Sequence, residues 1–128
     1  MRQTNLFKKP RKKQAHHESD MQIAVVRWFR YQYPKYSKLL FSIPNGAHTS
    51  EFQRQILTAQ GMVNGVADLM FAYPSGYHHA MFIEMKHGKN KQSQHQKDFQ
   101  KAAEEAGFKY VICYTSEEFI KEINEYLK

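Results

Sequence analysis

Two acidic residues and a lysine surround a predicted β-hairpin in the stretch NGVADLMFAYPSGYHHAMFIEMK, residues 64–86. Asp68 comes before the first apolar run, and Glu84 and Lys86 interrupt the second. A charged side chain inside a buried strand costs free energy unless it is paired or bound to a metal. This pattern therefore indicates a site that uses charge, which a purely structural hairpin would not need.

Side chains alternate along a strand, so Glu84 and Lys86 are expected on one face while the apolar residues between them face the core. If Pro74 pairs with His78 around a three-residue loop, Asp68 lies directly across from Glu84. Two carboxylates so placed repel each other, and both stay charged at neutral pH only with a cation between them. Mg²⁺ or Mn²⁺, which prefer oxygen ligands, fit this pair. The alternative is a surface cluster in which Lys86 neutralises both acids.

The elements that must position these residues are predicted in the order αβαββαβα, which makes an α/β domain with a mixed sheet flanked by helices. Helical spacing and capping signals predict helices over about residues 18–33 and 51–60, from Ser93 to Gly107, and from Thr115 or Ser116 onward. Apolar runs predict strands over about residues 38–44, 68–73, 79–86 and 108–114. In the first helix, Ile23 and Ala24 are expected to widen the buried stripe.

The net charge of +7 is concentrated near the first residue. Residues 1–17 contain six basic residues and no acid, whereas residues 18–128 contain 13 basic and 12 acidic residues. We therefore expect a basic flexible arm over residues 1–17 and a near-neutral domain over residues 18–128. The arm is either a contact for the phosphate backbone of nucleic acid or a solvated tail. Its candidate phosphate contacts are Lys8, Lys9, Arg11, Lys12 and Lys13.

The composition excludes several other classes of protein. A single cysteine, Cys113, cannot form an internal disulfide, and its apolar neighbours predict a buried structural thiol in a reduced, intracellular and cytoplasmic protein. No apolar run approaches the roughly 20 residues of a membrane span, and no secretory segment is expected. The seven histidines lack zinc-ligand spacing and a cysteine partner.

Asp68 followed by Glu84-x-Lys86 after a hairpin resembles the PD-(D/E)xK nuclease signature. The surrounding motifs are similar to the VRR-NUC branch, the virus-type replication–repair nucleases, over about residues 18–115. These motifs are "NG" at 45–46, "GVADL" at 65–69, "FIEMKHGKNKQSQHQ" at 82–96 and "EEAGFKYVICYT" at 104–115. The chain departs from the family in having Ala67 where a proline is usual. It also has "AHTSEFQRQ" where relatives are often basic, which leaves His48 and Arg54 as the candidate DNA contacts of that loop.

The resemblance implies a role for each residue of the hairpin. Asp68, Glu84 and the backbone carbonyl of Met85 would hold Mg²⁺ or Mn²⁺. Lys86 would orient or activate the attacking water and stabilise the pentacovalent phosphate. Gln96 resembles the active-site glutamine of the family, and it is also the expected capping-box partner of Ser93; the two roles are compatible.

The resemblance also implies a helix-borne acid, for which two residues compete. Glu18 precedes Gln22 by four residues, as in the family, and shares a helical face with Val25. Alternatively, Ser19 and Gln22 form a capping box, which would leave Glu18 outside the helix and make Asp20 the acid.

The implied activity is metal-dependent endonuclease cleavage of DNA, with branched DNA such as flaps or four-way junctions as substrate. Lys89, Lys91 and Lys97, together with His87, would form a basic rim along the DNA. Symmetric cutting of two strands needs two active sites, so a homodimer is expected. The alternative is a non-catalytic nucleic-acid-binding module with a nuclease-like fold, although a binding module needs no opposed acids.

Overall fold

The computed structural model describes the backbone of residues 11–44 and 49–128, and the side chains within those ranges from residue 16 onward. Its elements follow the predicted order αβαββαβα, with one 3-10 helix, η2, inserted after the first helix. The helices are α1 (Arg11–Gln32), η2 (Pro34–Leu39), α2 (Glu51–Ala59), α3 (Gln94–Glu105) and α4 (Ser116–Tyr126). The strands are β1 (Leu40–Ser42), β2 (Leu69–Phe71), β3 (Met81–Met85) and β4 (Lys109–Cys113).

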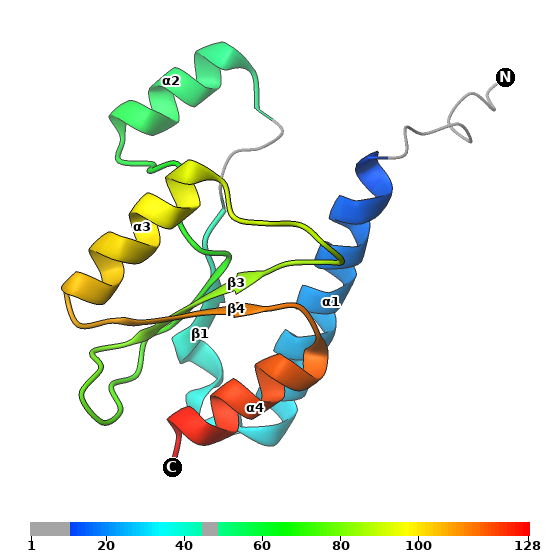
Figure 1. Ribbon diagram of the computed structural model, residues 1–128, viewed down its shortest axis with the longest axis vertical. Coiled ribbons are helices and arrows are strands. Elements are labelled where there is room, and N and C mark those ends of the chain that lie inside the picture. Colours follow the sequence, from blue (N-terminus) through cyan, green and yellow to red (C-terminus); the bar gives the residue numbers. More distant parts are fainter. Residues whose placement is uncertain (1–10, 45–48) are drawn as a thin grey trace, which may run out of the picture.

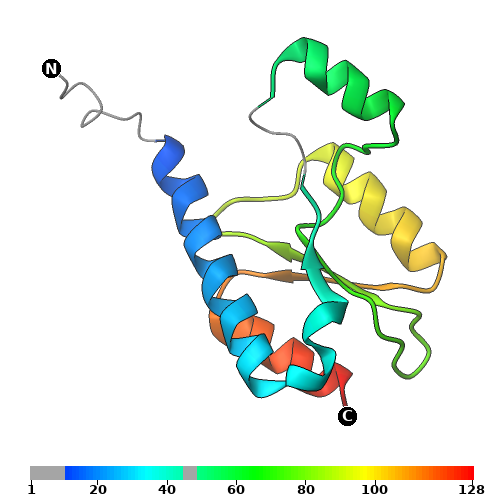
Figure 2. The same ribbon diagram turned by 180° about the vertical axis from the view of Figure 1, so that it is seen from behind.

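Among the described residues the strands form one sheet in the order β1-β2-β3-β4. The pairs β1–β2 and β2–β3 are antiparallel, whereas β3 and β4 are parallel because α3 crosses between them. Figure 1 shows α3 on one face of the sheet, with α1 and α4 on the other. The view from behind shows α4 beside the second half of α1 (Figure 2). The predicted fold class, an α/β domain with a mixed sheet between helices, is confirmed.

The main core lies between the sheet and the pair α1 and α4. Apolar side chains from the sheet, α1 and α4 are buried there. Each contributes roughly 1.5–3 kcal/mol to the stability of the fold relative to an exposed position. The largest fully buried ones are Phe29, Phe71, Phe119, Leu69, Met81, Ile83, Met85, Ile123 and Val25. The opposite face is covered by α3, where the ring of Phe82 packs edge-on against Phe99 at 5.0 Å and Phe108 at 5.4 Å.

The register of the β2–β3 hairpin confirms the prediction. Leu69 pairs with Ile83 and Met70 with Phe82, so continuing the ladder by one residue places Asp68 opposite Glu84. A slip of one residue would have turned Asp68 to the other face of the sheet.

The tip of the hairpin differs from the prediction. Ser75 pairs with His78, so the predicted pairing of Pro74 with His78 was wrong. The register at the tip differs by one residue from that of β2 and β3. The difference is accommodated at His79, whose N–H donates to the carbonyl of Gly107 at 3.0 Å instead of to the opposite strand of the hairpin. The change of register at the tip is therefore cancelled before the strands begin.

Helix α1 begins at Arg11, seven residues earlier than predicted, so residues 11–17 of the expected arm are helical. The run Arg-Lys-Lys-Gln-Ala consists of good helix formers and follows Pro10, a residue favoured at helix starts. Ser19 lies well inside the helix, so the alternative in which it caps the helix was wrong. Ile23, with 54% of its surface exposed, and Ala24 face outward, so they do not widen the buried stripe as predicted.

The starts of the later helices follow the predicted capping signals. Ser50 accepts a hydrogen bond from the N–H of Gln53 at the start of α2. Ser93 and Gln96 form the complete capping box of α3. Thr115, rather than Ser116, caps α4. Each cap satisfies a backbone N–H that the helix itself leaves unpaired.

Two further predictions from the composition were a buried thiol at Cys113 and the absence of a membrane-spanning segment. Cys113 is fully buried in the core, as predicted, and burial raises the pKa of its thiol to about 12. Such a thiol is uncharged at neutral pH and has a structural role. No helix in the described part of the chain combines the length and apolarity needed to cross a membrane.

Candidate active site

The predicted site residues converge where β2 begins and β3 ends, next to the first turn of α3. Glu84 and Lys86 lie on the α3 side of β3 and are both buried, with 2% and 9% of their surfaces exposed. Asp68, directly before β2, is partly buried opposite Glu84. Gln96 comes from the helix that covers this face. The structure therefore brings these four side chains together from elements that are separate in the sequence.

Gln96 connects the acid, the lysine and its own helix. Its Nε2 donates to Glu84 Oε2 at 2.9 Å, while its Oε1 accepts from Lys86 Nζ at 3.0 Å. The same Oε1 accepts the backbone N–H of Ser93 at 2.9 Å, which closes the capping box. The capping position thus fixes the amide so that each end faces the group it can bond. The predicted capping role of Gln96 is confirmed, and its active-site role stays a prediction.

Glu84 has two further neighbours. Lys86 Nζ lies 3.6 Å from Glu84 Oε2, close enough for an ion pair whenever Glu84 is ionised. The hydroxyl of Tyr110 on β4 lies 3.5 Å from Glu84 Oε1 and itself accepts from Gln92 Nε2 at 3.4 Å. Sequence reasoning missed Tyr110. Its alternation along β4, with the buried Val111 facing the opposite core, is the signal that could have placed it on the α3 side.

Asp68 is held by the backbone of the opposite strand. Its Oδ2 accepts the N–H of Met85 at 2.7 Å, and its own carbonyl accepts the N–H of Ile43 at 2.9 Å. The carboxylate is therefore oriented toward the end of β3. The predicted use of the Met85 carbonyl as a metal ligand stays a prediction.

The two carboxyl groups disfavour each other's charge. Burial, reinforced by the nearby Asp68 charge, raises the pKa of Glu84 to about 8. Burial also raises the pKa of Asp68, and the charge of Glu18 adds to that effect. At neutral pH, Glu84 therefore keeps a proton in the metal-free protein. A divalent cation between the acids would take the place of that proton.

Gly65 brings the strand that carries Asp68 against helix α3. Its φ of +87° lies in the left-handed region, and a Cβ at this position would lie 2.4 Å from the backbone carbonyl of His95 and 2.8 Å from the N of Gln96. Only glycine permits this approach. The "GVADL" motif thus sets the distance between Asp68 and Gln96 through a backbone contact.

Of the two candidate helix-borne acids, Glu18 faces the site. Its Oε2 accepts from Asn90 Nδ2 at 2.7 Å, and it lines the same cavity as Asp68. Asp20 instead lies 3.1 Å from His16 on the exposed side of α1. Asn90, in the loop between β3 and α3, was not predicted.

The donors present fit a hard cation that is bound mainly by water. Within the described residues, no three His, Cys, Asp or Glu side chains lie close enough to form a ready metal cage. Mg²⁺ commonly uses one or two carboxylates and keeps several waters, so Asp68 and Glu84 suffice for it, whereas structural zinc needs a fuller set.

The predicted DNA contacts are placed unevenly. Lys89 and Lys91 are exposed in the loop that carries Asn90, and Lys97 is exposed on α3 directly after Gln96, so the basic rim stays a prediction. Arg54 lies on α2, where its Nη2 donates to Asn64 Oδ1 at 3.1 Å. Other predicted contacts lie outside the described residues or side chains: Lys8, Lys9, Arg11, Lys12, Lys13 and His48.

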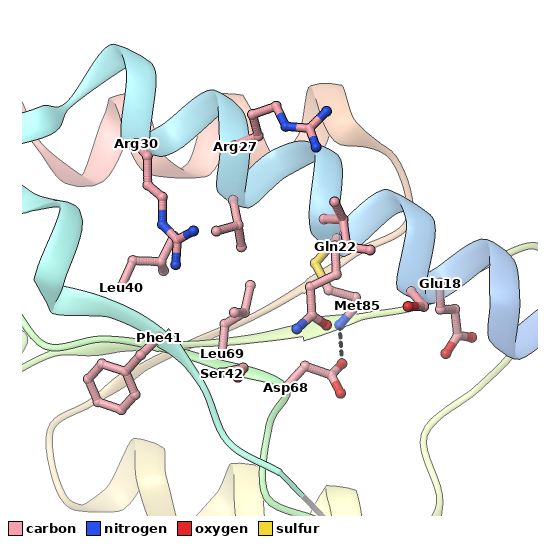
Figure 3. A pocket seen from close by; sticks show the side chains of 13 residues that line it. Glu18, Gln22, Arg27, Arg30, Leu40, Phe41, Ser42, Asp68, Leu69 and Met85 are labelled. Atoms are coloured by element: carbon pink, nitrogen blue, oxygen red, sulfur yellow. Dashed lines mark hydrogen bonds between the residues drawn. The ribbon is translucent and has the colours of Figure 1, made fainter.

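A cavity of about 670 Å³ opens beside the acids, between α1 and the sheet. Figure 3 shows Glu18 and Asp68 at one end, Gln22 projecting toward Asp68, and Arg30 reaching toward Leu40 at the other end. Arg27 and Phe41 also line it. None of these residues except the two acids was predicted as part of a site.

The fold has a counterpart among solved structures. The sheet places two acids and a lysine at the ends of its hairpin strands, which is where the sequence resemblance implies them. A solved structure described as a VRR_NUC domain protein matches with a TM-score of 0.75 and 21% identity, over 86% of this chain and 87% of that chain. The chain therefore has the VRR-NUC fold. No protein-family profile matches the sequence, and neither does any curated protein.

Proposed function

We propose that this protein is a metal-dependent endonuclease that hydrolyses phosphodiester bonds in DNA. The observation that carries the proposal is the group formed by the buried Glu84 and Lys86 with the partly buried Asp68 and Gln96, at the end of the β2–β3 hairpin. A binding module would gain nothing from two opposed carboxylates, which cost stability. The likeness in fold to a VRR_NUC domain protein supports the same function.

The residues divide the chemistry between them. Asp68 and Glu84 would hold Mg²⁺ or Mn²⁺, with the Met85 carbonyl and Glu18 as further candidate ligands. When bound, such an ion polarises the phosphate and lowers the pKa of a coordinated water. Lys86 contributes a positive charge beside the reacting phosphate and a proton donor or acceptor for water. Gln96 positions the Lys86 ammonium through the 3.0 Å hydrogen bond to its Oε1.

The test is a nicking assay on supercoiled plasmid with Mg²⁺ or Mn²⁺. Wild type is expected to nick, Lys86→Ala to lose the activity, and Lys86→Arg to stay inactive because arginine does not readily release a proton. Lys121→Ala, which removes an exposed charge on α4, is the matched control and should nick like wild type. Full activity of Lys86→Ala would contradict the assigned role.

The finer parts of the proposal concern the substrate and the assembly. Branched DNA is proposed because the family resemblance implies it, and a homodimer because paired cutting needs two sites. Flap, fork, four-way junction and linear duplex, assayed side by side, would rank the substrates. Sedimentation at assay concentration is expected to show a dimer. A strict monomer that cuts one strand of a junction would overturn the assembly.

A further inference from the structure

A chain of hydrogen bonds leads from the last turn of α3 to Glu84. Glu104 Oε2 accepts from Gln100 Nε2 at 3.2 Å, and Gln100 Oε1 accepts from Gln92 Nε2 at 2.9 Å. Gln92 Nε2 also donates to the hydroxyl of Tyr110 at 3.4 Å, and that hydroxyl donates to Glu84 Oε1 at 3.5 Å. The chain therefore ends on a carboxyl group that is proposed to hold the cation.

The direction of every bond in this chain follows from its outer end. A carboxylate only accepts hydrogen bonds, so the amide nitrogen of Gln100 must face Glu104. The amide oxygen of Gln100 then faces Gln92, which donates to it through its own amide nitrogen. The second hydrogen of that nitrogen is left for Tyr110, whose hydroxyl oxygen accepts it. The hydroxyl hydrogen of Tyr110 is therefore directed at Glu84.

Packing holds the Tyr110 side chain in place beneath α3. Tyr110 is 7% exposed, and its ring lies 6.3 Å from that of Phe99. Its partner across the β3–β4 ladder is Phe82, which alternation places on the same face as Glu84. A phenylalanine would pack the same ring, so packing does not account for the hydroxyl. Both hydrogen bonds of that hydroxyl lie in the polar site.

The two oxygens of the Glu84 carboxyl group are contacted from different elements. Oε2 accepts from the amide of Gln96 on α3 at 2.9 Å, while Oε1 faces the hydroxyl of Tyr110 on β4. A donor at each oxygen fixes the plane of the carboxyl group. Partners of this kind orient the ligands of a metal, and their loss typically weakens metal binding by about 10–100-fold.

We propose that Tyr110 is a positioning residue of the cation site and that Gln92 directs its hydroxyl. Tyr110 holds the Glu84 carboxylate in the orientation that binds the divalent cation. This rests on the proposed function for the role of Glu84 as a ligand. Hydrogen bonds at active sites are often long before cation and substrate bind, so the 3.4 Å and 3.5 Å contacts of the hydroxyl are expected to tighten in the loaded enzyme.

The test is a titration of the whole chain with Mn²⁺, in which the EPR signal of free Mn²⁺ gives the dissociation constant. Tyr110→Phe is expected to raise that constant about tenfold or more. Tyr126→Phe is the matched control. Tyr126 is 5% exposed and donates to the carbonyl of Tyr73 at 2.6 Å, so the variant also removes a buried hydroxyl, but one that does not contact Glu84. The control should bind Mn²⁺ like wild type.

Gln92 is tested through its dependence on Tyr110. Gln92→Met removes the donor and keeps the length of the side chain, so it should also weaken Mn²⁺ binding, by less than Tyr110→Phe. The double variant should bind Mn²⁺ as Tyr110→Phe does, because Gln92 acts through the hydroxyl. Losses that add up in the double variant would overturn the role of Gln92. A Tyr110→Phe variant that binds Mn²⁺ no more weakly than Tyr126→Phe would overturn the proposal.

The nuclease assignment fails separately. Asp68→Asn identifies the Mn²⁺ that binds between the acids, because it removes one of the two proposed carboxylate ligands. If wild type binds this Mn²⁺ but cuts no DNA, the proposed function is overturned, while the dissociation constants still decide the role of Tyr110. If Asp68→Asn binds Mn²⁺ as wild type does, both proposals are overturned.

Discussion

The two faces of strand β3 and the residue after it have opposite chemistry although they alternate along the same six residues, 81–86. Met81, Ile83 and Met85 face α1 and α4 and are at most 1% exposed in an apolar core. Glu84 and Lys86 face α3, and they are also buried, at 2% and 9% exposure. One face therefore stabilises the fold by burial, and the other imposes a cost on it.

The cost on the α3 face is offset by specific partners. Glu84 accepts a hydrogen bond from the side-chain amide of Gln96 and lies beside the Lys86 ammonium. Asp68 accepts a hydrogen bond from the backbone N–H of Met85. No buried side-chain polar atom in the described residues lacks a partner. The pKa of Glu84 nevertheless remains raised, to about 8, so the compensation is incomplete without a cation. The difference between the faces indicates that the polar one is arranged for binding and chemistry at the expense of stability.

The largest difference between the faces should appear on truncation of the apolar one. Ile83→Ala should lower the free energy of unfolding by about 3 kcal/mol, because it removes buried methyl groups and leaves a cavity. Glu84→Gln should leave the stability of the metal-free protein unchanged or raise it, because the neutral amide keeps the shape of the protonated carboxyl and does not require a proton to avoid a buried charge. Urea unfolding in EDTA measures both. If Glu84→Gln costs as much as Ile83→Ala, the two faces do not differ as described.

The contact of Gly65 with α3 predicts the next largest effect. Gly65→Ala should cost roughly 2 kcal/mol, since it combines a strained φ with a backbone clash, and it should also reduce cleavage by separating Asp68 from Gln96. Gly76→Ala is the matched control, because Gly76 also has a positive φ, +59°, but has nothing within 4 Å of its Cβ position. The control should cost less and keep full cleavage. Equal loss of cleavage in both variants would show that the close approach is not what matters.

A third prediction concerns pH in the metal-free protein. In the folded state Glu84 keeps its proton up to about pH 8, whereas the unfolded chain loses it near pH 4.5. The folded state thus binds more protons between these values, so the free energy of unfolding should fall as pH rises from about 4.5 to about 8. Glu84→Gln should lack this decline, so its advantage over wild type should grow with pH and level off above about 8. If the free energy of unfolding changes with pH in the same way in wild type and in Glu84→Gln, the pKa of Glu84 is not raised in the folded state.

The sequence was sufficient for the features that depend on local rules. Alternation in β3 and the pairing of Asp68 with Glu84 followed from a period of two residues, and the Ser93–Gln96 capping box from its spacing. The predicted pairing at the hairpin tip was wrong because His79 hydrogen-bonds to Gly107, a distant residue that local turn rules do not consider. Local helix propensity before residue 18 was underestimated, which shortened α1.

Other features depend on contacts between distant elements. Gly65 is one glycine among six in the sequence, and only the position of α3 shows why it must be glycine. Arg27 and Arg30 have the pattern of ordinary solvated residues on a helix. That they line the cavity beside Asp68 depends on where α1 lies against the sheet, which sequence periodicity does not specify.

The most direct test is a set of melting curves with and without Mn²⁺, run beside the nicking assay. Wild type should gain stability with Mn²⁺, by roughly 2.7 kcal/mol at a hundredfold excess over the dissociation constant. Asp68→Asn should keep or raise the metal-free stability and lose both the Mn²⁺ effect and cleavage, while Lys86→Ala should keep much of the Mn²⁺ effect without cutting. A wild type that does not respond to Mn²⁺, together with an Asp68→Asn variant that still nicks DNA, would contradict the assignment of this site as a metal-dependent nuclease centre.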